Sequence, residues 1–373
     1  MLANIADILM NDEAKVNQQI HLNCPSCQVF EYSYQGHIIS FVENNKNTPD
    51  KVIYRNMVYD LQAWHMVVVD EEDNVLFDSN DVKPVNKHRV YHCEEKLDFE
   101  YWNEPVTDLA HSGMKVVVSP KANEQLNMTR DLTEFLYYET EVNFPKDECT
   151  LAIGGTDANA FVAYVDGKFM GADDQHYHTD AWHTMYINMK ASAGKHKLVL
   201  LSESLGICNI MNPGQDPTWA SQRLKGICGW IKLCDQDIFN QEWKHYPGLA
   251  GEYYQVFTEE GAKKVEWKKD IKEADNLAWY RSTFKTPEGI NKRGIQVLLH
   301  PEGMGRGQAY INGHNIGRYW MIKNDKGEYT QDYYHIPKDW LMREGEENII
   351  TLGETLGATD PNVIICTTEY VSN

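Results

Sequence analysis

The sequence has no long apolar run and far fewer basic than acidic residues. No stretch approaches the roughly 18 consecutive apolar residues that a membrane-spanning helix requires, so we expect no membrane span. The 373 residues include 35 Lys and Arg against 55 Asp and Glu, which gives a net charge of −20. Such a charge repels phosphate groups, and it excludes nucleic acid and anionic membrane surfaces as expected partners.

Cysteine is also sparse, and the N-terminus lacks targeting features. Eight cysteines in 373 residues are too few for a disulfide scaffold, so we expect the reduced thiols of an intracellular protein. Cys24 and Cys27 form one CxxC pair, and no second pair completes a zinc site. Residues 1–20 predict a short helical segment that has neither the basic start nor the unbroken apolar run of a signal peptide. If Met1 is the natural start, we expect a cytoplasmic location.

One sequence pattern occurs twice. Val165–Gly171 recurs as Ile311–Gly317, and each copy holds an Asp-Gly or Asn-Gly pair between apolar segments. These pairs supply the positive φ angles of a tight β-hairpin. A matching apolar run follows each copy, at Lys197–Gly206 and at Asn348–Gly357. The chain is therefore predicted to carry two copies of one domain, which we interpret as two jelly-roll sandwiches in an all-β protein.

The chain is long enough for more than one domain, because single cores usually stop growing below this length. Short strand-like runs separated by Asn, Asp and Pro predict a further small β-sandwich before the two copies. No low-complexity linker separates the blocks, so we expect them to pack closely. The expected division is a helical segment at 1–20, a small sandwich at 21–97, a jelly roll at 98–240 and a second jelly roll at 241–373.

Four stretches resemble the non-catalytic C-terminal region of plant-type β-galactosidases of glycoside hydrolase family 35. They are Tyr59–Asp70 (YDLQAWHMVVVD), Glu124–Val142 (EQLNMTRDLTEFLYYETEV), Gly303–Trp320 (GMGRGQAYINGHNIGRYW) and Tyr334–Leu341 (YHIPKDWL). The first departs from the family, because Gln62-Ala63 replaces two prolines. The likeness extends from about residue 24 to 369 and implies tandem galactose-binding-like jelly rolls.

The same resemblance implies that the catalytic unit is missing. In the family an α/β barrel of roughly 300 residues precedes the sandwiches and supplies two glutamates. Only the first 20 or so residues precede the first predicted sandwich here, so we expect no enzyme activity, no catalytic residue and no cofactor. Trp102-Asn103-Glu104-Pro105 is similar to a glycosidase Asn-Glu-Pro motif. A catalytic glutamate needs a second carboxylate opposite it and an enclosed pocket, whereas Glu104 lies between two predicted sandwich blocks, so we interpret it as part of a linker.

Two groups of side chains are candidate binding residues. Exposed aromatic rings stack on sugars, and neighbouring amides and carboxylates bind the hydroxyl groups. A His-x-His pair with an acidic neighbour could bind a metal, although solvated loop histidines are the favoured interpretation. The sugar candidates are Trp182, Tyr177, Trp219, Trp320 and Tyr329, and the metal candidates are His176, His178 and His183.

We expect a structural role for a chain without its catalytic barrel. The favoured interpretation is a scaffold subunit that binds other proteins in a larger intracellular assembly, for instance a cytoskeletal or ciliary one. Two alternatives remain open. The chain is either a galactoside-binding module or the accessory chain of a split β-galactosidase. Large apolar residues exposed on the first sandwich would favour the accessory chain.

Overall fold

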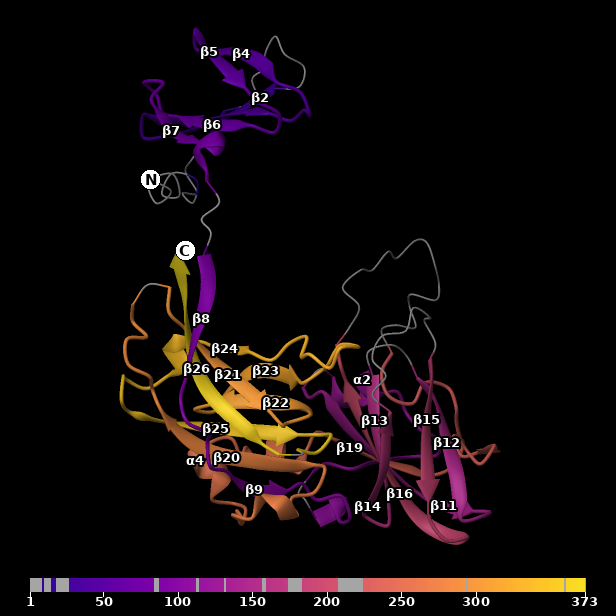
Figure 1. Ribbon diagram of the computed structural model, residues 1–373. Coiled ribbons are helices and arrows are strands. Elements are labelled where there is room, and N and C mark those ends of the chain that lie inside the picture. Colours follow the sequence, from indigo (N-terminus) through magenta and orange to yellow (C-terminus); the bar gives the residue numbers. More distant parts are fainter. Residues whose placement is uncertain are drawn as a thin grey trace. The chain divides into compact units, whose positions relative to one another are not determined.

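The computed structural model describes residues 9, 15–17, 27–83, 87–111, 114–130, 132–155, 159–173, 183–206, 224–292, 294–358 and 360–372. The predicted all-β class is confirmed, because sheets dominate the described residues and no barrel of alternating strands and helices occurs among them (Figure 1). The chain forms two compact units. Unit 1 comprises Met1–His88 with Ser372–Asn373, and unit 2 comprises Arg89–Val371.

Unit 1 holds a five-stranded sheet and a separate hairpin. The sheet order is β1-β2-β3-β6-β7. Residues 15–17, which the sequence places in a helical segment, instead form the edge strand β1. The hairpin β4–β5 turns at Arg55-Asn56, where both φ angles are positive. The strands are β1 (Lys15–Asn17), β2 (Cys27–Tyr34), β3 (His37–Asn44), β4 (Asp50–Tyr54), β5 (Met57–Leu61), β6 (Met66–Val69) and β7 (Val75–Asp78).

The first sandwich of unit 2 packs a six-stranded sheet on a four-stranded sheet. Alternate side chains such as Leu136 and Leu200 from one sheet meet Leu151 and Ile187 from the other in a single core. The larger sheet, in spatial order, contains β10 (Val117–Ser119), β19 (Trp243–Pro247), β11 (Phe135–Phe144), β16 (Gly194–Ser204), β13 (Asn159–Val165) and β14 (Lys168–Asp173). The smaller sheet contains β15 (His183–Lys190), β12 (Glu148–Gly155), β17 (Ile231–Leu233) and β18 (Gln236–Asp237).

The second sandwich of unit 2 has the same design. Its core joins residues of both sheets, including Tyr280, Ile311, Val297 and Ile365. One sheet contains β23 (His314–Trp320), β22 (Arg306–Ile311), β25 (Glu347–Glu354), β20 (Ala278–Lys285) and β9 (Glu100–Asn103). The other contains β24 (Tyr334–Ile336), β21 (Gln296–Glu302), β26 (Asn362–Ser372) and β8 (Lys87–Cys93).

The predicted repeat is present as two equivalent hairpins. Asp166-Gly167 joins β13 to β14 and Asn312-Gly313 joins β22 to β23, with positive φ at all four residues. Each hairpin also has a register shift at the same place, between Ala163 and Tyr164 in one and between Ala309 and Tyr310 in the other. The sequence repeat therefore encodes turn and bulge together.

Strand pairing does not follow the expected division of the chain. β8 and β9, from residues expected in the first and second blocks, complete the sheets of the last sandwich. β19, expected in the last block, pairs with β10 and β11 of the preceding sandwich. A cluster containing Tyr137, Val199, Trp279 and Tyr310 joins the two sandwiches, so the expectation of close packing holds within unit 2.

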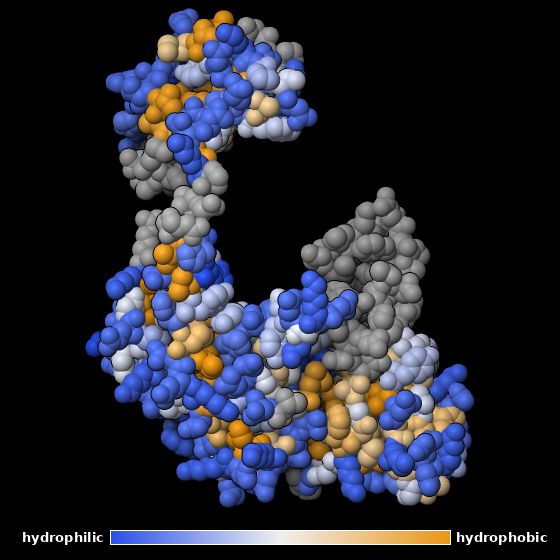
Figure 2. Space-filling model, in the orientation of Figure 1, coloured by the Kyte–Doolittle hydropathy of each residue, from blue (hydrophilic) through white to orange (hydrophobic). Residues whose placement is uncertain are grey.

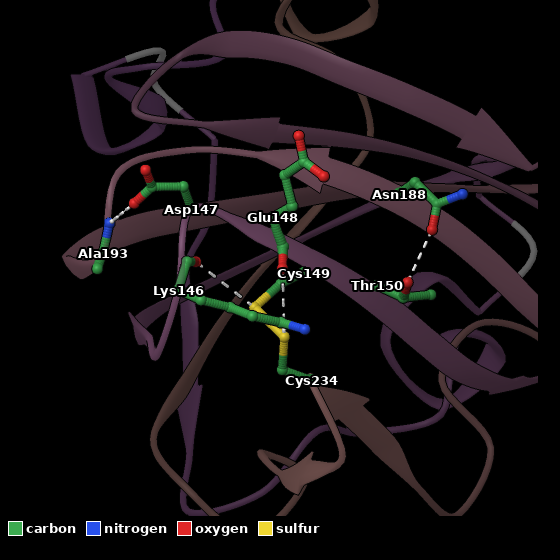
Figure 3. Close-up of a disulfide and its surroundings, with 8 residues drawn as sticks. All are labelled: Lys146, Asp147, Glu148, Cys149, Thr150, Asn188, Ala193 and Cys234. Atoms are coloured by element: carbon green, nitrogen blue, oxygen red, sulfur yellow. Dashed lines mark hydrogen bonds between the residues drawn. A yellow bond between two sulfur atoms is a disulfide. The ribbon is translucent and has the colours of Figure 1, made fainter.

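The expectation of reduced thiols is wrong for four cysteines. Cys93 is joined to Cys366, and Cys149 is joined to Cys234 (Figure 3). The partners are 273 residues apart in the first disulfide and 85 residues apart in the second, and only the folded sheets bring them together. In the part of the chain that the structure describes, no helix is long and apolar enough to span a membrane.

Candidate carbohydrate-binding site

Five of the residues singled out from the sequence lie outside the described part of the chain. They are Tyr177, Trp182, Trp219, His176 and His178. His183 is the first residue of β15. Among the described ranges, no three His, Cys, Asp or Glu side chains come together as a metal-ligand group.

Trp320 and Tyr329 are both described, and a cation lies over each ring. Trp320 ends β23 half-buried, with the Arg306 guanidinium carbon 5.1 Å from its ring centre. Lys323 Nζ lies 4.6 Å from the ring centre of Tyr329, and the two residues form an isolated β-bridge. Cation–π contacts of this kind favour a packing role for both rings. Their sugar-binding role stays a prediction.

A polar recess lies where the two sandwiches of unit 2 meet, and we name it the junction recess. Its volume is about 360 Å³. Residues of both sandwiches line it, with polar groups outnumbering the apolar side chains. The lining residues are Leu126, Leu132, Thr133, Glu134, Phe135, Ser204, Gly206, Glu252, Gln308 and Asn315.

A chain of hydrogen bonds orients one wall of the junction recess. Arg318 Nη2 donates to Glu134 Oε2 over 2.6 Å, and Gln308 Nε2 donates to the same oxygen over 2.5 Å. Asn315 Nδ2 donates to Gln308 Oε1 over 3.3 Å. Asn315 is exposed, whereas Gln308 is buried in β22. A fixed carboxylate and two fixed amides are therefore presented on this wall.

A second carboxylate, that of Glu252, also lines the junction recess. Glu252 Oε2 accepts hydrogen bonds from Thr133 Oγ1 over 2.7 Å and from the Leu249 N–H over 2.9 Å. Burial raises the pKa of both Glu252 and Glu134 above their ordinary value, against the opposing effect of these donors. Carboxyl and amide groups together accept from and donate to hydroxyl groups, which suits a polyol ligand.

A buried ion network joins the two sandwiches of unit 2. Arg306 Nε lies 2.9 Å from Glu203 Oε2, and both side chains are almost fully buried. Arg318 Nε lies 3.5 Å from Glu203 Oε1. Arg318 also donates to the carbonyl oxygens of Ser204 and Leu205. Arg318 thus reaches from β23 across the junction and holds Glu134 in place.

Glu104, the residue of the glycosidase-like motif, has a structural role. Its carboxylate is buried and accepts hydrogen bonds from the N–H groups of Ala250 and Gly251 and from Trp279 Nε1. It therefore holds the start of α3 (Ala250–Tyr254) against β20. Burial, only partly offset by these three donors, raises the pKa of Glu104 to about 7.

The raised pKa of Glu104 predicts a pH-dependent stability. Because the ordinary pKa is 4.5, the folded chain keeps a proton between pH 4.5 and about 7 that the unfolded chain loses. The free energy of unfolding should fall by about 3 kcal/mol as pH rises from 4.5 to about 7, and it should level off above this window. Urea unfolding at pH 5 and pH 8 should show this difference between wild type and Glu104→Gln. Equal pH slopes in the two proteins, or no carboxyl titration near pH 7 by infrared spectroscopy of the wild type, would contradict it.

Known proteins resemble the chain over most of its length. Residues 277–348 match the family described as the galactose-binding domain of β-galactosidase. Beta-galactosidase 14 of Arabidopsis thaliana is 28% identical over 347 residues, which cover 88% of this chain and 38% of that protein. Beta-galactosidase 7 of Oryza sativa subsp. japonica is 29% identical over 359 residues, which cover 92% of this chain and 44% of that protein. The chain is similar to the C-terminal part of plant β-galactosidases.

The similarity confirms the family resemblance found in the sequence. The chain spans about two fifths of the length of the plant β-galactosidases that it matches. The part of a glycoside hydrolase that is covered is the galactose-binding part, and the matched part does not extend over a catalytic domain. Gln308 and Asn315 of the junction recess lie inside the galactose-binding match.

Sequence reasoning missed most of the junction recess. It concentrated on aromatic rings, whereas the recess is built from Glu134, Glu252, Gln308 and Asn315. A usable signal was present for Glu134, Gln308 and Asn315, because they belong to the Glu124–Val142 and Gly303–Trp320 stretches that carry the family likeness. No spacing in the sequence shows that Glu134 and Gln308, 174 residues apart, are hydrogen-bonded.

Proposed function

We propose that the chain is a non-catalytic galactoside-binding unit that accompanies a β-galactosidase-type catalytic domain. The observation that carries the proposal is that Gln308 and Asn315 lie within the galactose-binding match and also line the junction recess. The recess would take a terminal galactosyl group. Glu134 and the two amides would bind its hydroxyl groups, and Leu126 and Leu132 would contact its apolar face.

The size and polarity of the recess support this assignment. Its volume of about 360 Å³ lies at the lower end of the roughly 300–1,000 Å³ typical of small-molecule sites. Hydrogen bonds fix Gln308 and Glu134 before any ligand arrives. Such preorganisation lowers the entropy that binding costs.

The disulfides bear on the location. The two disulfides, Cys93–Cys366 and Cys149–Cys234, favour an oxidising compartment, because the cytosol keeps thiols reduced. We therefore favour a secretory or extracellular location over the cytoplasmic, cytoskeletal or ciliary one expected from the sequence. This choice also suits a galactoside ligand, which is abundant on secreted glycans.

A protein-binding role has support of its own in unit 1. Ile53 and Val58 are cross-strand partners on the outer side of the β4–β5 hairpin, and each is more than half exposed. Trp64 is 65% exposed, has a positive φ, and donates from Nε1 to Asn47 Oδ1. Apolar residues also reach the surface of unit 1 in Figure 2. Exposed apolar side chains favour docking to a partner chain, and the accessory chain of a split enzyme fits this better than an unrelated scaffold.

The galactoside proposal predicts a loss of binding in Asn315→Ala. Calorimetric titration with galactose and lactose should give measurable binding to the wild type, and Asn315→Ala should weaken it about tenfold, since one hydrogen bond of about 1.4 kcal/mol is lost. Asn291→Ala is the matched control, because Asn291 is an exposed amide that donates to Glu344 Oε1 outside the recess. No heat of binding in the wild type, or an equal loss in both variants, would refute the assignment. Hydrolysis of lactose by the purified chain would refute the non-catalytic role.

A further inference from the structure

We propose that the outer face of the smaller sheet of the first sandwich in unit 2 binds a neutral, extended polysaccharide. The site is separate from the junction recess and goes beyond the proposed galactoside function. We name it the Tyr186 face. It is formed by β12, β15 and the β17–β18 turn, and its hollow has a volume of about 740 Å³. Its principal residues are Glu148, Thr150, Ala152, Tyr186, Asn188 and Lys190.

Strand alternation places these six side chains together on the outside. The intervening residues Leu151, Ile153, Met185 and Ile187 point into the core. The register pairs Glu148 with Lys190, Thr150 with Asn188 and Ala152 with Tyr186, so the outer side chains form a ladder of neighbours across two strands. The face is thus a regular, fixed surface.

Aromatic side chains mark one end of the ladder. Tyr186 is 60% exposed in the middle of β15, and its cross-strand neighbour Ala152 is small. One step further along, Trp230 lies over Gly154, where a Cβ would come within 2.5 Å of Trp230 Nε1. An exposed tyrosine ring beside a small residue offers a platform on which a pyranose ring can stack.

Hydrogen-bonding groups continue from the aromatic end. Thr150 Oγ1 donates to Asn188 Oδ1 over 2.7 Å. Figure 3 shows that the Asn188 amide nitrogen points away from Thr150. Lys190 Nζ lies 2.9 Å from Glu148 Oε1. Amide, hydroxyl, ammonium and carboxylate groups therefore succeed one another beside the ring, and these are the groups that bind sugar hydroxyls.

The charge of the face selects a neutral ligand. Its lining has two basic residues, Lys146 and Lys190, and two acidic residues, Glu148 and Asp235. This balance contrasts with the net charge of −20 of the whole chain. The lining therefore neither attracts a polyanion nor concentrates cations.

The length of the face selects an extended ligand. The ladder runs from Glu148 to Ala152 in β12, which spans roughly 14 Å at about 3.4 Å per residue. Such a span exceeds one sugar ring and accommodates several linked rings. The Cys149–Cys234 disulfide fixes the edge, because it joins β12 to the turn that carries Asp235. A rigid edge keeps the site preformed.

The experiment is affinity electrophoresis of the whole chain in native gels that contain a soluble polysaccharide. Separate gels hold neutral β-1,4-galactan, neutral mixed-linkage β-glucan, galactomannan or anionic polygalacturonate. At least one neutral polymer should retard the wild type, and Tyr186→Ala should weaken the affinity about tenfold or more. Asn188→Ala should weaken it less, and polygalacturonate should give no retardation.

Two control variants keep the test decisive. Tyr253→Ala removes a tyrosine that is 59% exposed on α3, away from the face, and should be retarded like the wild type. Asn315→Ala, which tests the junction recess, should also be retarded like the wild type. Retardation by no neutral polymer, by polygalacturonate alone, or equally for wild type and Tyr186→Ala would overturn the proposal. A loss caused by Asn315→Ala would assign the binding to the recess instead.

Discussion

Replacing Cys93 and Cys366 together by serine is expected to lower the free energy of unfolding of unit 2 by up to about 5 kcal/mol. The disulfide closes a loop with a sequence separation of 273 residues, and a cross-link stabilises mainly by reducing the entropy of the unfolded chain. It also ties β8 to β26 at one edge of the last sandwich. Guanidinium unfolding of both proteins without reductant, followed by tryptophan fluorescence, measures the difference.

Cys228→Ser is the control for this result. Cys228 is buried and is not part of a disulfide, so its replacement changes a thiol without opening a loop. It should shift the unfolding midpoint far less than the double variant does. If reductant lowers the stability of the double variant and of the wild type by the same amount, the Cys93–Cys366 bond contributes nothing and the prediction fails.

Glu203→Gln is expected to destabilise unit 2 by about 3–5 kcal/mol. Glu203 accepts from Arg306 Nε, and its other oxygen faces Arg318 Nε. Removing the negative charge leaves the buried Arg306 guanidinium without the carboxylate partner that it has in the wild type, which costs more than the intact pair contributes. Urea unfolding monitored by circular dichroism measures the loss. The charge also fixes Arg318 and through it Glu134, so galactoside binding should weaken as well.

Glu260→Gln serves as the matched control, because it removes a carboxylate from an exposed ion pair with Lys263. Solvent screens such a pair, so the unfolding midpoint should stay where it is in the wild type. A double variant, Glu203→Gln with Arg306→Met, should recover part of the stability, since the buried positive charge is then removed. A Glu203→Gln protein as stable as Glu260→Gln would show that the network is not required.

The fold could be predicted from local sequence signals. Asp166-Gly167 and Asn312-Gly313 each specify a hairpin, because few residue pairs adopt positive φ at both positions. Alternating apolar residues such as Leu151 and Ile153 specify which side of a strand faces the core. Each of these signals is contained within a few neighbouring residues of the sequence. The predictions of the all-β class and of the repeat, which rest on such signals, were therefore correct.

Long-range relations could not be predicted. Cys93 and Cys366 are brought together because β8 and β26 are neighbours in one sheet, and no spacing in the sequence reveals this pairing. The number of cysteines alone led to the wrong expectation of reduced thiols. The Glu134–Gln308 bond of the recess likewise depends on how two sandwiches dock. The aromatic ring of Tyr186 was overlooked because exposure in the middle of a strand depends on the neighbouring strand, here on the small Ala152.

The placement of β8 and β9 affects how the protein is made. The other strands of the sheet that contains β9 begin at β20, about 175 residues later in the chain, and those of the sheet that contains β8 begin at β21, about 200 residues later. A ribosome delivers residues in order, so these two segments emerge well before their partners exist. The intervening sandwich can close first, while the two early segments remain without a sheet. A fragment that starts after β9 would lack β8 and β9, two of the strands that form the sheets of the last sandwich.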